Sequence, residues 1–288
     1  MLTPLPPRTT RLGPLEIRRL LPVRQRRLIG PWCFLDRYGP LSFTDEKPMD
    51  VAPHPHIGLQ TVTWLLSGEV LHRDSLGSEA MIRPGQLNVM TSGKGISHAE
   101  ETPRSHSGVL SGVQLWVALP DAARHRDPSF EHHAELPRMD VRGADVTLFI
   151  GGGSPASAYS PMVGAEARVR EGTSLPLDGS FEHGVMLMEG DATADSVELE
   201  IDRLYHAAPG LDELPVETQR GARLMLLGGA PFGEQVYMWW NFVARSKEEI
   251  AAARADWEAH RFGEVIGYEG ARIEAPQFPV PAEANPAS

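Results

Sequence analysis

Short β-type runs separated by turn residues extend through most of this chain and restrict what it can fold into. The 28 glycines and 25 prolines interrupt helices and end strands. Clear runs are LQTVTWLL (59–66), GVQLWVAL (112–119), DVTLFI (145–150), GVMLME (184–189) and ARLMLLGG (222–229). The sequence therefore predicts a mainly β protein of sandwich or barrel type.

One helix is expected near the end of the chain, over about 246–262, in SKEEIAAARADWEAHRFG. Ser246 and Glu249 have the spacing of a capping box, in which each side chain bonds a free backbone N–H of the first turn. One face carries Ile250, Ala253 and Trp257. This apolar stripe predicts that the helix packs on a barrel.

Two pairs of similar segments suggest an internal repeat. They are WLLSGEV (64–70) with MLMEGDA (186–192), and RPGQL (83–87) with APGLD (208–212). Two barrels of similar construction would explain the matches. The polar, turn-rich segment 120–137 is a candidate connection between them.

Composition argues against several classes of protein. No run of eighteen apolar residues and no signal peptide is evident, and a single cysteine allows no internal disulfide. We therefore expect a cytoplasmic protein without a membrane partner, with Cys33 buried and inert. Residues 1–30 hold seven arginines and one acid, but the net charge of −11 would repel phosphate, so direct nucleic-acid binding is not expected.

Two histidines at the start of a β-type run form the first chemical motif, PHPHIGLQTVTWLLSG (53–68). Residues i and i+2 of a strand point to one face, so His54 and His56 present both imidazoles on the same side. Pro53 and Pro55 lack an N–H, which places this strand at a sheet edge or start.

A second pair with the same spacing, His98 and Glu100, follows in TSGKGISHAEETP. On neighbouring antiparallel strands the two pairs could supply three imidazoles and one carboxylate to a metal. This set leaves open coordination positions and suits Fe(II), with Mn, Ni and Cu as alternatives, better than a closed structural zinc site.

At this point the sequence resembles a known family. HPHIGLQTVTWLLSGEVLHRDSLGS, RPGQLNVMTSGKGISHAEE and GVQLWVALP are similar, in order and spacing, to the pirin branch of the cupin superfamily. The similarity is strong over about residues 28–120 and weaker, but collinear, through LLGGAPFGE (226–234) and the terminal helix.

The resemblance implies a bicupin, in which two cupin-type β-barrels (double-stranded β-helices) face each other. The expected domains are a metal-binding barrel at 1–130 and a second barrel at 131–288 that carries the helix and an extended tail. The three-His, one-Glu ligand pattern of the family falls on His54, His56, His98 and Glu100, with one mononuclear iron per chain.

Two positions depart from the family pattern. Where most pirins carry a glutamate this chain has Gln60, which counts on the same strand parity as the histidines; we expect a neutral side chain that orients a ligand or substrate from outside the ligand set. VYMWWNFVARS (236–246) also differs from the stretch usual in the family, and the sequence alone offers no account of its effect.

The second half retains no equivalent ligand set. At the offsets of the repeat, the two histidines of the first pair become Pro176 and Asp178, and the second pair becomes Arg223 and Met225. His183 is then a lone histidine with a structural role, and we expect one metal per chain.

Two functions from different classes share these ligands. The resemblance implies a quercetin 2,3-dioxygenase, which opens the ring of a flavonol with dioxygen and releases carbon monoxide, with Glu100 as base and Trp64 and Met90 lining the pocket. The alternative is a regulatory protein whose iron oxidation state alters a surface that a protein partner binds. A well-formed pocket open to the metal would favour the enzyme.

Overall fold

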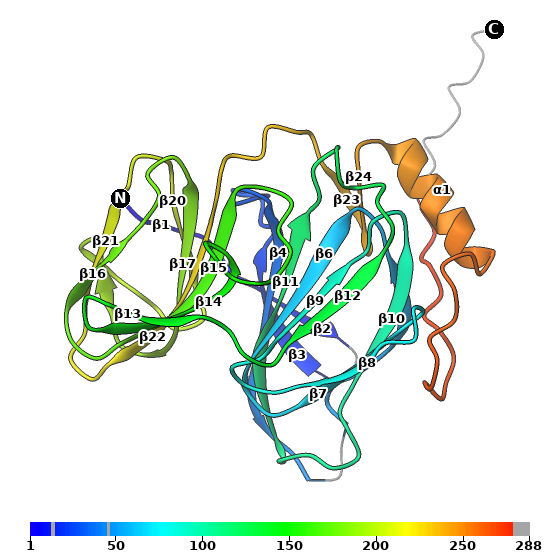
Figure 1. The fold of residues 1–288 in the computed structure, drawn as a ribbon, viewed down its shortest axis with the longest axis horizontal. Helices are drawn as coiled ribbons and strands as arrows, with labels where there is room; N and C mark the ends of the chain where they lie inside the picture. Colours follow the sequence, from blue (N-terminus) through cyan, green and yellow to red (C-terminus); the bar gives the residue numbers. More distant parts are fainter. Residues whose placement is uncertain (13–14, 45–46, 279–288) are drawn as a thin grey trace, which may run out of the picture.

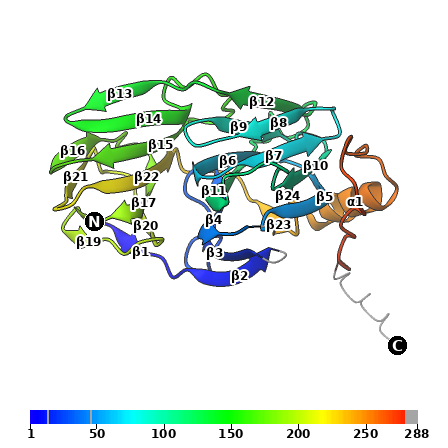
Figure 2. The same cartoon turned by 90° about the horizontal axis from the view of Figure 1, so that it is seen from below.

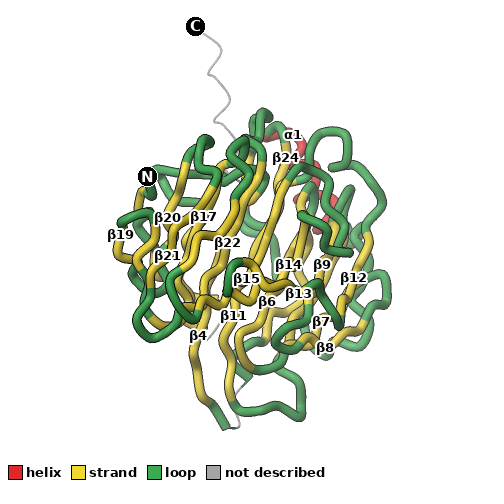
Figure 3. Tube along the Cα trace, turned by 60° about the vertical axis from the view of Figure 1, so that its left-hand side comes forward, coloured by secondary structure: helices red, strands yellow, loops and turns green. Residues whose placement is uncertain are grey.

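The computed structural model describes residues 1–12, 15–44 and 47–278. They form 24 strands and one helix, arranged as two β-barrels side by side (Figure 1). Strands make up both barrels, and the helix lies at one side of the molecule (Figure 3). The predictions of a mainly β fold and of two cupin barrels are confirmed. No helix of the described part is long and apolar enough to cross a membrane.

The N-terminal barrel is built from two antiparallel sheets. The larger has the order β12 (Ser129–His133), β9 (Leu87–Thr91), β6 (Leu59–Ser67), β11 (Val109–Ala118), β4 (Trp32–Ser42), β3 (Leu15–Leu21) and β2 (Arg8–Leu12). The smaller has the order β5 (Asp50–His56), β10 (Ile96–Glu101), β7 (Val70–Asp74) and β8 (Glu79–Ile82).

The C-terminal barrel repeats this construction. Its larger sheet has the order β1 (Thr3–Pro4), β20 (Leu204–Ala207), β17 (Glu182–Gly190), β22 (Ala222–Gly229), β15 (Met162–Val169), β14 (Ala144–Gly151) and β13 (Arg138–Val141). Its smaller sheet has the order β16 (Thr173–Pro176), β21 (Glu213–Glu217), β18 (Thr193–Ala194) and β19 (Val197–Glu198).

The two barrels therefore match strand for strand, and this tests the repeat seen in the sequence. The first pair of segments lies on or beside β6 and β17, which hold the same position in their sheets. The second pair does not correspond, because RPGQL precedes β9 whereas APGLD follows β20 and precedes β21. The strand order thus makes β21, not β22, the counterpart of β10, and Arg223 and Met225 are not the counterparts of His98 and Glu100.

The two barrels lie side by side (Figure 2), and one cluster of buried apolar side chains from their large sheets fills the space between them. Alternate residues of β6 and β11, such as Val62 and Val113, belong to the same buried cluster as Met186 and Met225 of the second barrel. Trp64 stacks on Phe149 with ring centroids 5.2 Å apart. Because strand side chains alternate between faces, the other residues of the same strands line the barrel interiors.

Three segments cross the domain boundary expected at residue 130. The N-terminal strand β1 pairs with β20 and so completes the C-terminal barrel, whereas β12 pairs with β9 of the N-terminal barrel. The return segment, defined here as residues 230–278, leaves the C-terminal barrel and packs on the N-terminal one (Figure 1). The helix expected within the second domain therefore covers the first.

The return segment contains β23 (Tyr237–Trp239), β24 (Phe242–Ala244) and α1 (Lys247–Glu258). The Ser246 hydroxyl accepts a hydrogen bond from the Glu249 N–H, as the capping motif predicted. The residues of α1 that are buried are Ile250, Ala253 and Trp257. The helix ends at Glu258, four residues before the predicted end, and residues 279–288 of the expected extended tail lie outside the described residues.

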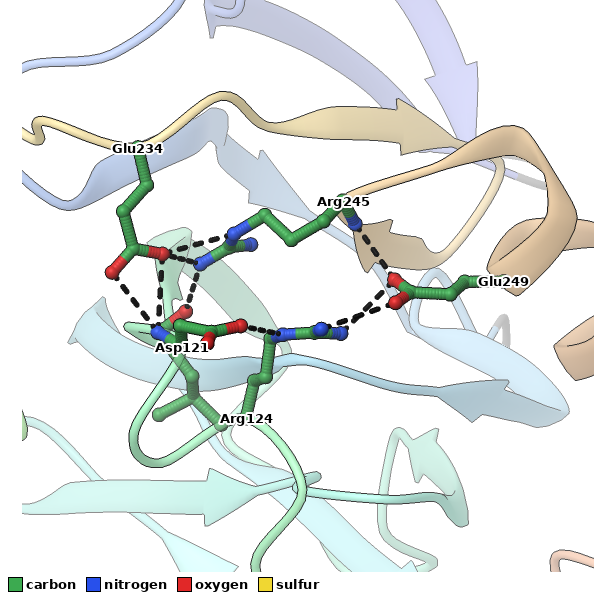
Figure 4. Close-up of polar contacts among 6 residues, drawn as sticks. Asp121, Arg124, Glu234, Arg245 and Glu249 are labelled. Atoms are coloured by element: carbon green, nitrogen blue, oxygen red, sulfur yellow. Dashed lines mark hydrogen bonds and ion pairs between the residues drawn. The ribbon is translucent and has the colours of Figure 1, made fainter.

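An ion-pair network fastens the return segment to the loop after β11 (Figure 4). The Arg124 guanidinium donates to both carboxylate oxygens of Glu249, at 2.9 and 3.1 Å, and to Asp121 at 2.7 Å. Arg245 is paired with Glu234 and donates to the Leu119 carbonyl at 2.8 Å. The Arg124–Glu249 and Arg245–Leu119 contacts join residues more than 100 positions apart.

Candidate metal centre

Three histidines of the N-terminal barrel converge on one point. His54 and His56 lie on β5, and His98 lies on the neighbouring strand β10, directly opposite His54. One ring nitrogen from each lies within 4.8 Å of the others, and all three side chains are buried. Within the described residues this is the one such group of His, Cys, Asp and Glu.

The local sequence explains this placement. β5 is the edge strand of the smaller sheet, where Pro53 and Pro55 lose no ladder hydrogen bond on the side that faces away from β10. The two prolines also fix the backbone on either side of His54. The edge position predicted from the two prolines is confirmed.

The Nδ1 atom of each histidine has a hydrogen-bond partner. The Nδ1 of His54 lies 2.9 Å from the Ala52 carbonyl oxygen, and that of His56 lies 3.0 Å from the Asn241 carbonyl oxygen. A carbonyl only accepts, so both rings donate from Nδ1. The Nδ1 of His98 lies 3.4 Å from the Nδ1 of His72.

The arrangement of the remaining nitrogens fits a bound cation. Burial lowers the pKa of His54 to about 4, and burial followed by the neighbouring imidazoles lowers the pKa of His56 and His98. The rings are therefore neutral at pH 7, with lone pairs available. The Nε2 atoms of His56 and His98 are only 3.1 Å apart, which suits two ligands of one ion. The three histidines could hold a metal.

Glu100 lies in the same cavity but outside the group of three. A strand irregularity between His98 and Glu100 places Glu100 opposite Val51. Its carboxylate Oε1 lies 3.3 Å from the Thr63 hydroxyl, and burial raises its pKa. The structure therefore brings the histidines together and leaves the carboxylate beside them.

A cavity of about 410 Å³ opens onto the histidines. Phe34 and Trp116 stack in one wall with ring centroids 4.0 Å apart, and Trp116 meets the edge of His56 at 5.1 Å. The Arg19 guanidinium covers Phe34 at 4.4 Å and is bound by both carboxylate oxygens of Asp36, at 2.8 and 2.7 Å. The result is an aromatic wall that runs from the metal position to an ion pair.

Gln60 lies elsewhere than the sequence parity suggested. Its amide nitrogen donates to the Thr91 hydroxyl and to the Ser157 carbonyl, both at 3.0 Å, and not to any of the histidines. A turn at Ile57 and Gly58 separates β5 from β6, so the alternation of side chains between the two faces of β5 does not continue into β6. Instead Thr61 lines the cavity.

The expected positions of Trp64 and Met90 in the cavity wall are wrong, whereas the expectation of a buried Cys33 is confirmed. Trp64 faces the second barrel, where its Nε1–H donates to Glu166 at 2.8 Å, and Met90 is buried but does not line the cavity. Cys33 is fully buried, and burial raises its pKa to about 12, as an inert thiol requires.

The sequence reasoning missed three residues that contribute to the centre. Trp240 and Asn241 of the return segment line the cavity, so the unusual WWNFVA stretch closes the site from more than 180 residues away. His72 on β7 reaches His98, and it belongs to a further i, i+2 pair, His72 and Asp74, whose spacing could have marked it.

The second barrel carries no corresponding group in the described chain. On the equivalent strand pair β16–β21, Leu175 lies opposite Leu214, and both are buried in the barrel's apolar core. His183 is buried on β17 without a hydrogen-bond partner among the described residues. One candidate metal centre per chain follows from this part of the structure.

Comparison with known proteins agrees with this architecture. Residues 15–117 match the family model described as Pirin, and residues 164–263 match the Pirin C-terminal cupin domain. A Pseudomonas aeruginosa protein provisionally named as quercetin 2,3-dioxygenase PA1205 is 44% identical over 95% of this chain and 89% of its own length. A Caulobacter vibrioides pirin-like protein is 40% identical over 87% of this chain and 90% of its own.

A crystal structure described as quercetin 2,3-dioxygenase from Acinetobacter baumannii superposes with a TM-score of 0.92. It is 43% identical to this chain and covers 96% of each.

Proposed function

The chain belongs to the pirin family, and on that premise we propose that it is a mononuclear non-haem iron dioxygenase of the quercetin 2,3-dioxygenase type. Its substrates would be dioxygen and a small, flavonol-like aromatic molecule. The names of the relatives from Pseudomonas and Acinetobacter support the reaction class.

The observation that carries the proposal is the cavity itself. At about 410 Å³ it falls within the range of small-molecule sites, and the three histidines form one end of it. Phe34, Trp116 and Trp240 supply flat apolar surface for an aromatic ring. A centre that only sensed oxidation state would need no such chamber.

We assign the metal ligands as His54, His56, His98 and Glu100. The first three present neutral imidazole nitrogens at one point, and Glu100 lines the same cavity. Three neutral ligands and one carboxylate suit Fe(II), with Mn, Ni and Cu as substitutes. Iron, when bound, would supply the one-electron chemistry that reaction with dioxygen requires.

Glu100 also has the properties of a base for the substrate hydroxyl. Burial raises its pKa, which brings the carboxylate closer to the range in which a general base is most effective. The Thr63 hydroxyl, 3.3 Å from Glu100 and 3.0 Å from the Gln114 side-chain oxygen, is placed to orient it. The Phe34–Trp116 wall would hold the substrate ring while the proton passes to Glu100.

The direct test is oxygen uptake and carbon monoxide release when quercetin is added to Fe(II)-loaded protein. We expect both with wild-type protein and neither with His98→Ala. Protein that holds one iron per chain but consumes no oxygen with quercetin or other flavonols would overturn the enzyme assignment and favour the iron-dependent regulatory protein.

A further inference from the structure

His98 differs from the other two histidines in what holds it. The Nδ1 atoms of His54 and His56 each donate to a backbone carbonyl, whose accepting role is fixed. The Nδ1 of His98 faces another imidazole nitrogen, the Nδ1 of His72, at 3.4 Å. An imidazole nitrogen can donate or accept, so which of the two nitrogens donates depends on the partner of the other ring nitrogen of His72.

Asp74 decides it. The carboxylate oxygen Oδ2 of Asp74 lies 3.1 Å from the Nε2 of His72, and the other oxygen accepts the N–H groups of Leu76 and Ser78, both at 2.9 Å. Burial acts to raise the pKa of Asp74, but the hydrogen bonds from His72 and Ser78 outweigh it and lower the pKa. The carboxylate is therefore ionised and can only accept.

The proton positions then follow in order. The Nε2 of His72 donates to the Asp74 carboxylate, so its Nδ1 is the atom left to accept a hydrogen bond from His98. His98 must donate from its own Nδ1 to that atom, which leaves the Nε2 of His98 bare toward His56. Without this order, His98 could carry its proton on Nε2 and bond His56 instead of a metal.

Packing keeps the chain of contacts in place. His72 and Asp74 are 3% and 0% exposed, and His72 stacks on Phe130 of β12 with ring centroids 4.3 Å apart. β7 pairs with β10 so that His98 lies opposite Asp74 and Glu100 lies opposite His72. This chain of hydrogen bonds from Asp74 through His72 to His98, called the relay below, therefore lies in the same sheet as the proposed ligands.

We propose that Asp74, acting through His72, is a positioning residue that fixes His98 in the tautomer whose Nε2 lone pair faces the metal position. This inference depends on the proposed metal ligands but not on dioxygenase activity.

The sharpest variant is Asp74→Asn. The two backbone N–H groups of Leu76 and Ser78 require an oxygen at their position, so the asparagine NH₂ would face His72. Every hydrogen bond of the relay would then reverse, and the proton of His98 would move to Nε2. We expect metal affinity to fall about 10- to 100-fold.

Two measurements test this on the full-length chain. In metal-free protein labelled with ¹⁵N-histidine, two-bond ¹H–¹⁵N spectra should show the proton of His98 on Nδ1 in the wild type and on Nε2 in Asp74→Asn. Affinity for Zn²⁺, which has no redox chemistry, is measured by competition with a chromophoric chelator.

Glu101→Gln is the matched control, because it removes one carboxylate charge from the outer face of β10, where Glu101 binds Arg73 at 2.8 Å. We expect its Zn²⁺ affinity to stay within about twofold of wild type. Equal affinities of Asp74→Asn and Glu101→Gln would overturn the proposal. So would a wild-type spectrum with the His98 proton on Nε2, and that result needs no variant to fold. Loss of oxygen uptake with normal Zn²⁺ binding would instead count against the proposed function alone.

Discussion

The two barrels share one strand order but fill their interiors differently. On β5 and β10 of the first barrel, His54 lies opposite His98, whereas on β16 and β21 of the second, Leu175 lies opposite Leu214. The first pair brings polar rings to a cavity and the second closes an apolar core. The same strand order therefore accommodates either a cavity lined by polar rings or a closed apolar core.

The difference extends to how each interior is supported. The Ala52 carbonyl orients His54 and the distant Asn241 carbonyl orients His56. His72 orients His98. Leucines require only close packing, which neighbouring side chains of the same sheets provide. One of these contacts, from Asn241, comes from outside the two sheets of the barrel, because the return segment supplies it.

The largest effect should come from His98→Ala. Removing one of the four assigned ligands should lower the metal content of the purified protein well below one per chain, because the two remaining imidazoles and Glu100 hold the ion less tightly. Elemental analysis of the purified variant measures it. Circular dichroism should show an unchanged β fold, and a variant that retained one metal per chain would contradict the assignment of the ligands.

The reciprocal change in the second barrel is Leu214→Ala. Leu214 is fully buried, so the variant should lose about 2–5 kcal/mol of unfolding free energy through lost burial and the cavity left behind. Urea denaturation measures the loss. Metal content should remain at the wild-type level, and a parallel loss of metal would show that the two interiors are not independent.

The stability of the metal-free protein should fall between pH 6.5 and pH 4. The neutral form of His54 is favoured by burial, which lowers its pKa from 6.5 to about 4, so the unfolded chain binds more protons in this window. At about 1.4 kcal/mol per pKa unit the loss from His54 alone is on the order of 3 kcal/mol. Above pH 6.5 the His54 ring is neutral in both the folded and the unfolded chain, so this loss of unfolding free energy is absent there.

Denaturation midpoints of His54→Gln, measured across the same range, provide the comparison for this titration. The variant should show a shallower decline than wild type, because the glutamine does not titrate. An identical slope would mean that the pH dependence arises elsewhere, for example at buried His183 of the second barrel, whose pKa burial also lowers.

The smallest effect is expected from Arg124→Ala in the network that fastens the return segment. Its partner Asp121 is exposed and Glu249 is about one-third exposed, so the loss of unfolding free energy should be at most about 1 kcal/mol. Hydrogen exchange should nevertheless accelerate in β23 and β24. Unchanged exchange there would show that apolar packing alone holds the segment.

Local sequence pattern was sufficient for much of the site. The i, i+2 spacing placed His54 and His56 on one face, and the prolines placed β5 at an edge. Likewise the Ser246 cap and the apolar stripe located the helix, because both depend on neighbours within one or two turns. These features rest on interactions that are short in sequence.

The same reasoning failed where the chain turns. Gly58 has a φ of +69°, and a Cβ there would lie 2.0 Å from the Val243 carbonyl oxygen. A glycine allows both this conformation and the close approach of the return segment. The turn resets the strand alternation, so Gln60 faces Ser157 and Thr61 faces the cavity.

The sequence by itself determined the β texture, the two pairs of candidate ligands and the terminal helix, because strand alternation and capping act over a few residues. Only the tertiary structure decided which barrel the helix covers, that Asn241 and His72 orient the histidines, and where Glu100 lies relative to them. These arrangements depend on contacts between residues far apart in the chain, which arise from the packing of whole sheets and leave no periodic signal in the sequence.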